Sequence, residues 1–257
     1  MRTRMGPWAT NNDWPAATPA ARSGSATRCG VRRGRGRRRC TRCCGTWRRS
    51  ASTGRPGRGR EVLSFLPGET VGASRPWPAW AHSDDALRQV ARWLRDLHAA
   101  VAGFVPPAGA RWREGGVWRP GLIVGHNDAA PYNAAWADGR LVGFFDWDLA
   151  APVTREWDLA FTAFAWVPLH ARHVVATEGF TAFADRPRRL RLFLDAYGHA
   201  GPVGPFVEVV RQRVAASAEG IRRTAAAGDP AYRTMVDHGV DAALETAVRE
   251  LADFPAG

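Results

Sequence analysis

The sequence predicts an α+β fold in which helices predominate and the strands form little more than one small β-hairpin. Apolar residues recur at helical spacing over much of the chain after residue 80. Two short apolar runs flank Asp138-Gly139, a dipeptide typical of tight hairpin turns. The 257 residues are 45% hydrophobic, which is enough apolar material for a sizeable core.

The first predicted elements are a strand over residues 60–68, closed by a Pro67-Gly68 turn, and a helix over 83–103. Ser83 is a good helix cap because its hydroxyl can accept a bond from a free amide of the first turn. The carboxylates that follow it suit the positive end of the helix dipole. The predicted buried stripe of this helix consists of Leu87, Val90, Ala91, Leu94 and Leu97.

A strand over 122–124 comes next, followed by the hairpin with strands 133–136 and 141–145. The remainder is predicted to be helical, because its apolar residues return every three to four positions. Pro230 suits the first turn of a helix, where its missing N–H removes no hydrogen bond. The predicted helices cover residues 156–167, 187–198, 204–227 and 230–253.

The net positive charge of the chain comes from residues 1–60, since the remaining residues carry slightly more acidic than basic side chains. The whole chain has a formal net charge of +12, and this segment holds sixteen arginines and one aspartate. It also holds all four cysteines, and the chain contains no lysine. Because the segment has no apolar period, we expect residues 1–59 to be unable to bury enough surface to fold.

One interpretation of this segment is an arm that binds nucleic acid. The run over 32–39 could neutralise phosphates and would then bind in a salt-sensitive way. Another is a zinc site, because Cys40-x-x-Cys43 has the spacing of a metal knuckle. Cys29 is its nearest upstream partner, however, and the segment contains no histidine.

The interpretation that we favour is a frameshifted stretch of a GC-rich gene. Such stretches are typically rich in Arg, Gly, Cys, Trp and Ser, as this segment is. Shifting the frame by one base turns the codons of Cys43, Cys44 and Trp47 into codons for apolar residues at helical spacing. Residues 1–59 are therefore a disordered or frameshifted segment in our domain prediction, and we do not expect nucleic acid as a partner.

Three oxygen-bearing side chains are predicted to meet after the strand at 122–124. Asp128 and Asn133 lie five residues apart in one loop, and Asp146 ends the return strand of the hairpin. Phosphoryl transfer needs a carboxylate that accepts the proton of the attacking hydroxyl. It also needs oxygen ligands for magnesium, which neutralises the phosphates. The three residues supply both.

The motif His126-x-Asp128-x-x-x-x-Asn133, followed by Asp146-Trp-Asp148, resembles the signature of the aminoglycoside phosphotransferase and choline kinase families. These families share a bilobed protein-kinase-like fold. The resemblance covers about residues 60–250 and implies that Asp128 is the catalytic base and that Asn133 and Asp146 bind Mg²⁺. The supporting residues that it implies are His126, Asp148 and Asp158.

The resemblance also implies a domain organisation. Residues 60–80 would be the remaining strand and hinge of an incomplete amino-terminal lobe, and 81–257 the helical carboxy-terminal lobe. The backbone of Ser64, Phe65 and Leu66 would then bond the adenine ring. The amino-terminal lobe of the family supplies a lysine to the phosphates, which this chain lacks.

We therefore expect a phosphotransferase that uses ATP or GTP and Mg²⁺ to phosphorylate a small-molecule hydroxyl. An alternative is a pseudoenzyme or immunity-type binding protein, since similar short bacterial proteins include some related to toxin immunity. The third hypothesis is nucleic-acid binding through the arginine-rich arm. No apolar run reaches the roughly 18 residues that cross a bilayer, and residues 1–10 lack a secretory signal. We expect no membrane association and a cytoplasmic location.

Overall fold

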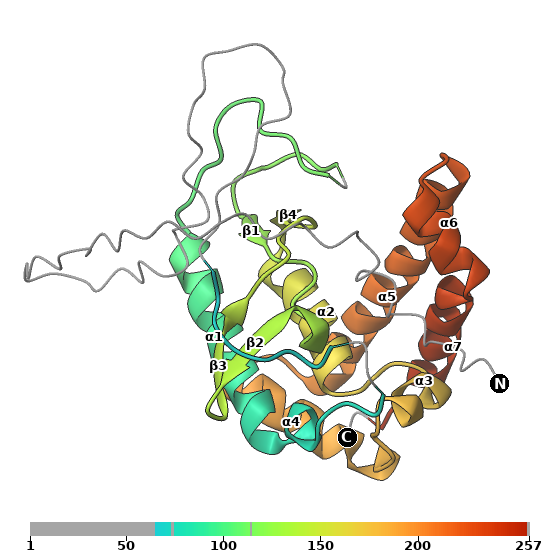
Figure 1. Ribbon diagram of the computed structural model, residues 1–257. Coiled ribbons are helices and arrows are strands. Elements are labelled where there is room, and N and C mark those ends of the chain that lie inside the picture. Colours follow the sequence, from blue (N-terminus) through green and yellow to red (C-terminus); the bar gives the residue numbers. More distant parts are fainter. Residues whose placement is uncertain (1–64, 73–74, 114, 256–257) are drawn as a thin grey trace, which may run out of the picture.

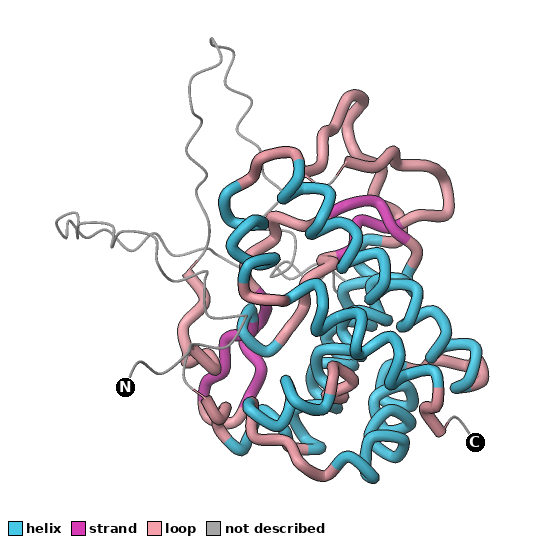
Figure 2. Tube along the Cα trace, turned by 90° about the vertical axis from the view of Figure 1, so that its right-hand side faces the viewer, coloured by secondary structure: helices cyan, strands magenta, loops and turns pink. Residues whose placement is uncertain are grey.

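The structure is a computed structural model that describes residues 65–72, 75–113 and 115–255 (Figure 1). The arginine-rich segment at 1–59, with all its interpretations, lies outside these residues, as does Ser64. The described chain has the predicted α+β fold, with helices making up most of it and strands confined to two places (Figure 2). None of its helices combines the length and apolar character needed to cross a bilayer.

Helix α1 spans Asp84–Val101 and confirms the prediction made from its cap. The Ser83 hydroxyl oxygen accepts a 3.1 Å hydrogen bond from the Ala86 amide. All five residues of the predicted stripe are buried. They pack in one continuous core with α2 (Arg155–Trp166) and α4 (Arg186–Tyr197).

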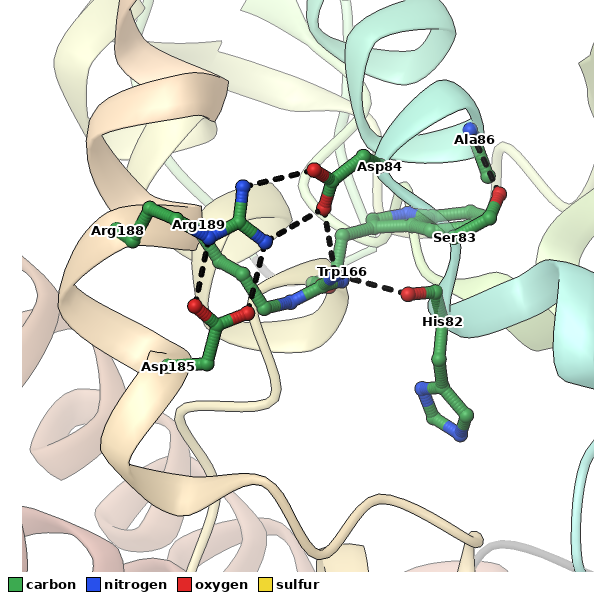
Figure 3. A network of polar contacts seen from close by, with 8 residues as sticks. All are labelled: His82, Ser83, Asp84, Ala86, Trp166, Asp185, Arg188 and Arg189. Carbon is green, nitrogen blue, oxygen red and sulfur yellow. Dashed lines mark hydrogen bonds and ion pairs between the residues drawn. The ribbon is translucent and has the colours of Figure 1, made fainter.

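A polar network joins the start of α1 to α4 (Figure 3). Asp84 accepts two hydrogen bonds from Arg188, of 2.7 and 2.9 Å, and one of 3.2 Å from Arg189. The buried Arg189 guanidinium also donates to the carbonyl oxygens of His82 and Trp166. Burying this cation is tolerable because several oxygens surround it. The network thereby fixes the carboxyl end of α2 against α1.

The hairpin consists of β2 (Ala134–Ala137) and β3 (Arg140–Phe144), paired antiparallel as predicted. Asp138 and Gly139 form the turn and both have positive φ, 52° and 71°, as a type I′ turn requires. Gln89 of α1 donates to the Gly139 carbonyl at 3.0 Å and accepts from the Leu141 amide at 2.9 Å. The helix therefore holds the hairpin by its turn.

A second sheet pairs β1 (Ile123–Gly125) with β4 (Ala151–Val153). The sequence predicted β1 to within a residue but did not predict β4. Strand β4 is only three residues long and contains Pro152, which cannot donate to a ladder. It pairs with β1 alone, so this proline removes no required bond.

The carboxy-terminal helices are α5 (Val203–Ala226), α6 (Pro230–Asp237) and α7 (Val240–Ala252). The predicted single helix over 230–253 is wrong, because Gly239 takes a left-handed conformation with φ 71° and ends it. Helix α5 packs against α2, α6 and α7. The short α3 (Arg172–Thr177) was also not predicted. The described residues also form three short 3₁₀ turns: η3 (Ala79–His82), η4 (Pro131–Asn133) and η5 (Phe183–Asp185).

The first described segment, 65–72, touches the hairpin instead of continuing as the predicted strand. Glu69 exchanges two backbone hydrogen bonds with Trp136 of β2, of 2.7 and 2.8 Å. Gly68 lies so close to this strand that a Cβ would stand 2.3 Å from the Trp136 carbonyl oxygen. Val71 packs nearby in a small cluster with Trp77 and Ala81.

Candidate functional site

The candidate site is the loop over residues 126–133, which leads from β1 into β2 and ends in η4. Two tethers hold it from the helical side. The Trp166 indole donates to the Ala129 carbonyl at 2.9 Å. Arg213 of α5 donates to the Asn127 carbonyl at 3.1 Å while its guanidinium lies over the Phe161 ring. The loop is therefore fixed to α2 and α5.

Asp128 receives two side-chain hydrogen bonds within this loop. The Tyr132 hydroxyl donates to Oδ1 at 2.9 Å, and the Asn133 amide nitrogen donates to Oδ2 at 2.8 Å. The same Asn133 nitrogen donates to the Asp128 carbonyl at 3.0 Å. These bonds orient the carboxylate. Tyr132 was missed from the sequence, although it lies only four residues after Asp128 in the same loop.

Burial raises the pKa of Asp128 to about 7. The negative charge of Asp146 pushes in the same direction, whereas the bonds from Tyr132 and Asn133 and the charge of Arg213 oppose the rise. A carboxylate with a pKa near neutrality is suited to accept a proton and release it again. The effect of Asp146 also means that the two carboxylates are within electrostatic reach of each other.

Asn133 and Asp146 provide oxygen atoms that suit a hard cation. Because the Asn133 nitrogen is bonded to Asp128, its Oδ1 oxygen points away from that bond, and no described residue donates to it. Asp146 follows β3, is exposed, and has φ 60°, a backbone conformation rare for a residue with a side chain. Although the residue is exposed, its carboxyl group is partly desolvated, and this desolvation together with the charge of Asp148 raises its pKa.

These donors fit magnesium, which prefers carboxylate and amide oxygens and keeps several water ligands. Among the described residues, no three His, Cys, Asp or Glu side chains cluster as a metal site. A cation at this loop would thus depend on the Asn133 amide in addition to carboxylates.

His126 is buried and neutral. Its Nδ1 accepts a 3.3 Å bond from the Asp128 amide, so the ring proton lies on Nε2, which donates to the Phe145 carbonyl at 3.1 Å. Burial lowers its pKa to about 4. The ring also lies 4.4 Å from that of Trp147. His126 thus connects the loop that carries Asp128 to Phe145, the residue before Asp146.

Asp158 of α2 is completely buried beneath the loop. Its carboxylate accepts bonds from the amides of His126 and Asn127, at 3.0 and 2.6 Å, and contacts His98 Nε2 at 3.0 Å. Burial acts to raise its pKa, but the contact with His98 and the backbone bonds hold the pKa below its usual value. His98 in turn contacts the Tyr197 hydroxyl at 2.7 Å. Asp158 is therefore an ionised anchor for the loop.

Because Gly125 has no side chain, the Asp158 carboxylate can lie directly against it. A Cβ on Gly125 would lie 2.7 Å from Val153 Cγ2 and 2.8 Å from the Asp158 carboxylate. Such distances are too short for a real Cβ, so a side chain at this position would force its neighbours to shift. This glycine could not be singled out from the sequence, since the contact joins residues 33 positions apart.

Gly125→Ala is expected to lower the free energy of unfolding by about 2–3 kcal/mol, because the new methyl group overpacks the junction. Gly143→Ala is the matched control, since its Cβ would meet only Leu66, at an ordinary 3.5 Å. Urea denaturation of both variants would compare them. Equal stabilities would show that the loop can shift to admit the methyl group.

The remaining predicted residues are Asp148 and the three residues predicted to contact adenine. Asp148 is exposed and forms a 2.7 Å ion pair with Arg113. Phe65 is exposed, Leu66 lies near Gly143 of β3, and Ser64 falls outside the described residues. Contact of these three residues with adenine stays a prediction.

No protein-family model matches the chain. It is similar to a trifolitoxin immunity protein of Rhizobium leguminosarum bv. trifolii, with 35% identity over 149 residues. The similar region covers 57% of this chain and 55% of that protein. The chain thus spans about half the length of the curated relative that it matches.

Proposed function

We propose that this chain is a phosphotransferase that moves the terminal phosphoryl group of ATP or GTP to a hydroxyl group of a small molecule. The observation that carries the proposal is the Asp128 carboxylate, which is oriented by Tyr132 and Asn133 and has a pKa near 7. Asp146, on the neighbouring hairpin, acts electrostatically on the same group.

In the proposed reaction, Asp128 accepts the proton of the acceptor hydroxyl. The hydroxyl oxygen forms a bond to the terminal phosphorus, and the bond from that phosphorus to the bridging oxygen breaks, releasing the nucleoside diphosphate. Asn133 and Asp146 would hold magnesium, which neutralises charge on the phosphate oxygens. Tyr132 and Asn133 keep the carboxylate oriented for the proton.

Magnesium with ATP or GTP is expected to raise the melting temperature of the full chain by several degrees, because a ligand that binds only the folded state stabilises it. Asp146→Ala should remove most of this shift, since it deletes one oxygen ligand. Asp138→Ala, in the exposed hairpin turn, is the control, because it removes one negative charge just as Asp146→Ala does. An unchanged melting temperature at millimolar concentrations of both nucleotides would contradict the proposal.

A second candidate is an immunity-type binding protein, which the similarity to the trifolitoxin immunity protein favours. Such a protein would protect cells by binding a toxin without transferring phosphate. The two functions separate in one experiment, in which Asp128→Asn is expressed in cells exposed to trifolitoxin. Protection by the wild type that survives this substitution favours binding, whereas protection that disappears with a stably folded variant favours catalysis.

A further inference from the structure

The long connection between α1 and β1 brings an arginine to the candidate site. In Figure 1 this connection extends beyond β1 and β4, at the end of the molecule away from α4. It rests on β4, because the Cβ position of Gly116 lies 3.8 Å from Pro152. A turn closed by the 3.0 Å bond from the Gly115 amide to the Trp112 carbonyl contains Arg113.

The Arg113 guanidinium is directed at the carboxylates that follow β3. It donates a 2.7 Å hydrogen bond to Asp148, two residues after Asp146. This contact places Arg113 next to the segment that carries Asp146, one of the proposed magnesium ligands.

The ion pair between Arg113 and Asp148 can exchange readily. The two side chains retain 49% and 65% of their solvent exposure, and exposed ion pairs contribute only about 0–1 kcal/mol. A phosphate offers a planar guanidinium two parallel, charge-assisted bonds and is a stronger partner. Arg213, by comparison, is held under the loop by its bond to Asn127 and its contact with Phe161.

We propose that Arg113 leaves Asp148 when the nucleotide enters and binds the terminal phosphoryl group. This inference rests on the proposed phosphotransferase function and assigns a cation to a chain that has no lysine. This cation, Arg113, lies in the connection between α1 and β1.

Equilibrium binding of Mg·ATP, Mg·GTP, Mg·ADP and adenosine to the full chain tests this assignment. With whichever triphosphate the wild type binds, Arg113→Ala is expected to raise the Kd about tenfold, as for loss of a charged hydrogen bond. It should leave the Kd values of Mg·ADP and adenosine nearly unchanged, because these lack the terminal phosphoryl group. Arg113→Lys keeps the charge without the fork and should give an intermediate value.

Arg95→Ala is the matched control, because Arg95 pairs with Asp96 on α1 at similar exposures of 49% and 67%. Its triphosphate affinity should equal that of the wild type. If Arg113→Ala binds the triphosphate within twofold of the wild type while Asp146→Ala does not bind, the role of Arg113 is overturned and the proposed function stands. If the wild type binds neither triphosphate, the proposed function fails, and the role of Arg113 with it.

Discussion

Replacing Asp158 with alanine is expected to lower the free energy of unfolding by about 3–5 kcal/mol, the usual cost of removing one partner of a buried charged network. The substitution would leave the amides of His126 and Asn127 without acceptors and take away the contact of His98. It would also leave a cavity beneath the loop. Thermal unfolding should show a decrease of about 10 °C for a domain of this size.

Asp96→Ala provides the comparison, because it removes a carboxylate from an exposed ion pair and should cost less than about 0.5 kcal/mol. The difference between wild type and Asp158→Ala should also depend on pH. A folded-state pKa below the unfolded value of about 3.9 stabilises the protein above that pH. This contribution should disappear as the pH falls through the lower, folded-state pKa. Equal melting temperatures at neutral pH would contradict the role of Asp158 as an anchor.

Replacing Asp128 with asparagine is expected to reduce phosphoryl transfer by about 10²–10⁴-fold, the usual contribution of a general base. The same variant should be more stable than the wild type at neutral pH by about 1–2 kcal/mol, because a partly buried carboxylate is replaced by a neutral group of the same shape. The asparagine can still pair with Tyr132 and Asn133. Loss of activity together with a higher melting temperature separates a catalytic effect from misfolding.

The stabilising effect of Asp128→Asn should grow with pH. The folded-state pKa of about 7 lies above the unfolded value of about 3.9, so the wild type loses stability as pH rises between these values. The difference in melting temperature should therefore increase from pH 4 to pH 7 and stay constant above it. A difference that does not vary with pH would show that Asp128 titrates in the usual range of a carboxyl group.

The elements that the sequence predicted well are those with local signals. Ser83 caps α1 through its own side chain, and Asp138-Gly139 is one of the few dipeptides that readily adopts two positive φ angles. The spacing of Asp128 and Asn133 also foretold their contact, because both lie in one short loop. Such features depend on a few neighbouring residues, so a single sequence is sufficient to find them.

The features that the sequence did not predict depend on distant partners or on weak local signals. Strand β4 has three residues and a proline, and it exists because β1 lies beside it. The contact of Asp158 with His98 joins two helices that are far apart in the chain. Gly239 carried a local signal for the end of α6, but the apolar period on both sides of it favoured one helix.

The close approach of Gly125 to Asp158 also has an evolutionary consequence. A side chain at residue 125 and a carboxylate at residue 158 compete for the same volume, so the two cannot be accommodated together without a shift. A lineage that acquired a larger residue at 125 would have to shorten the residue at 158 and give up the tie to the loop. Related sequences with a larger residue at 125 should therefore carry a shorter residue at 158.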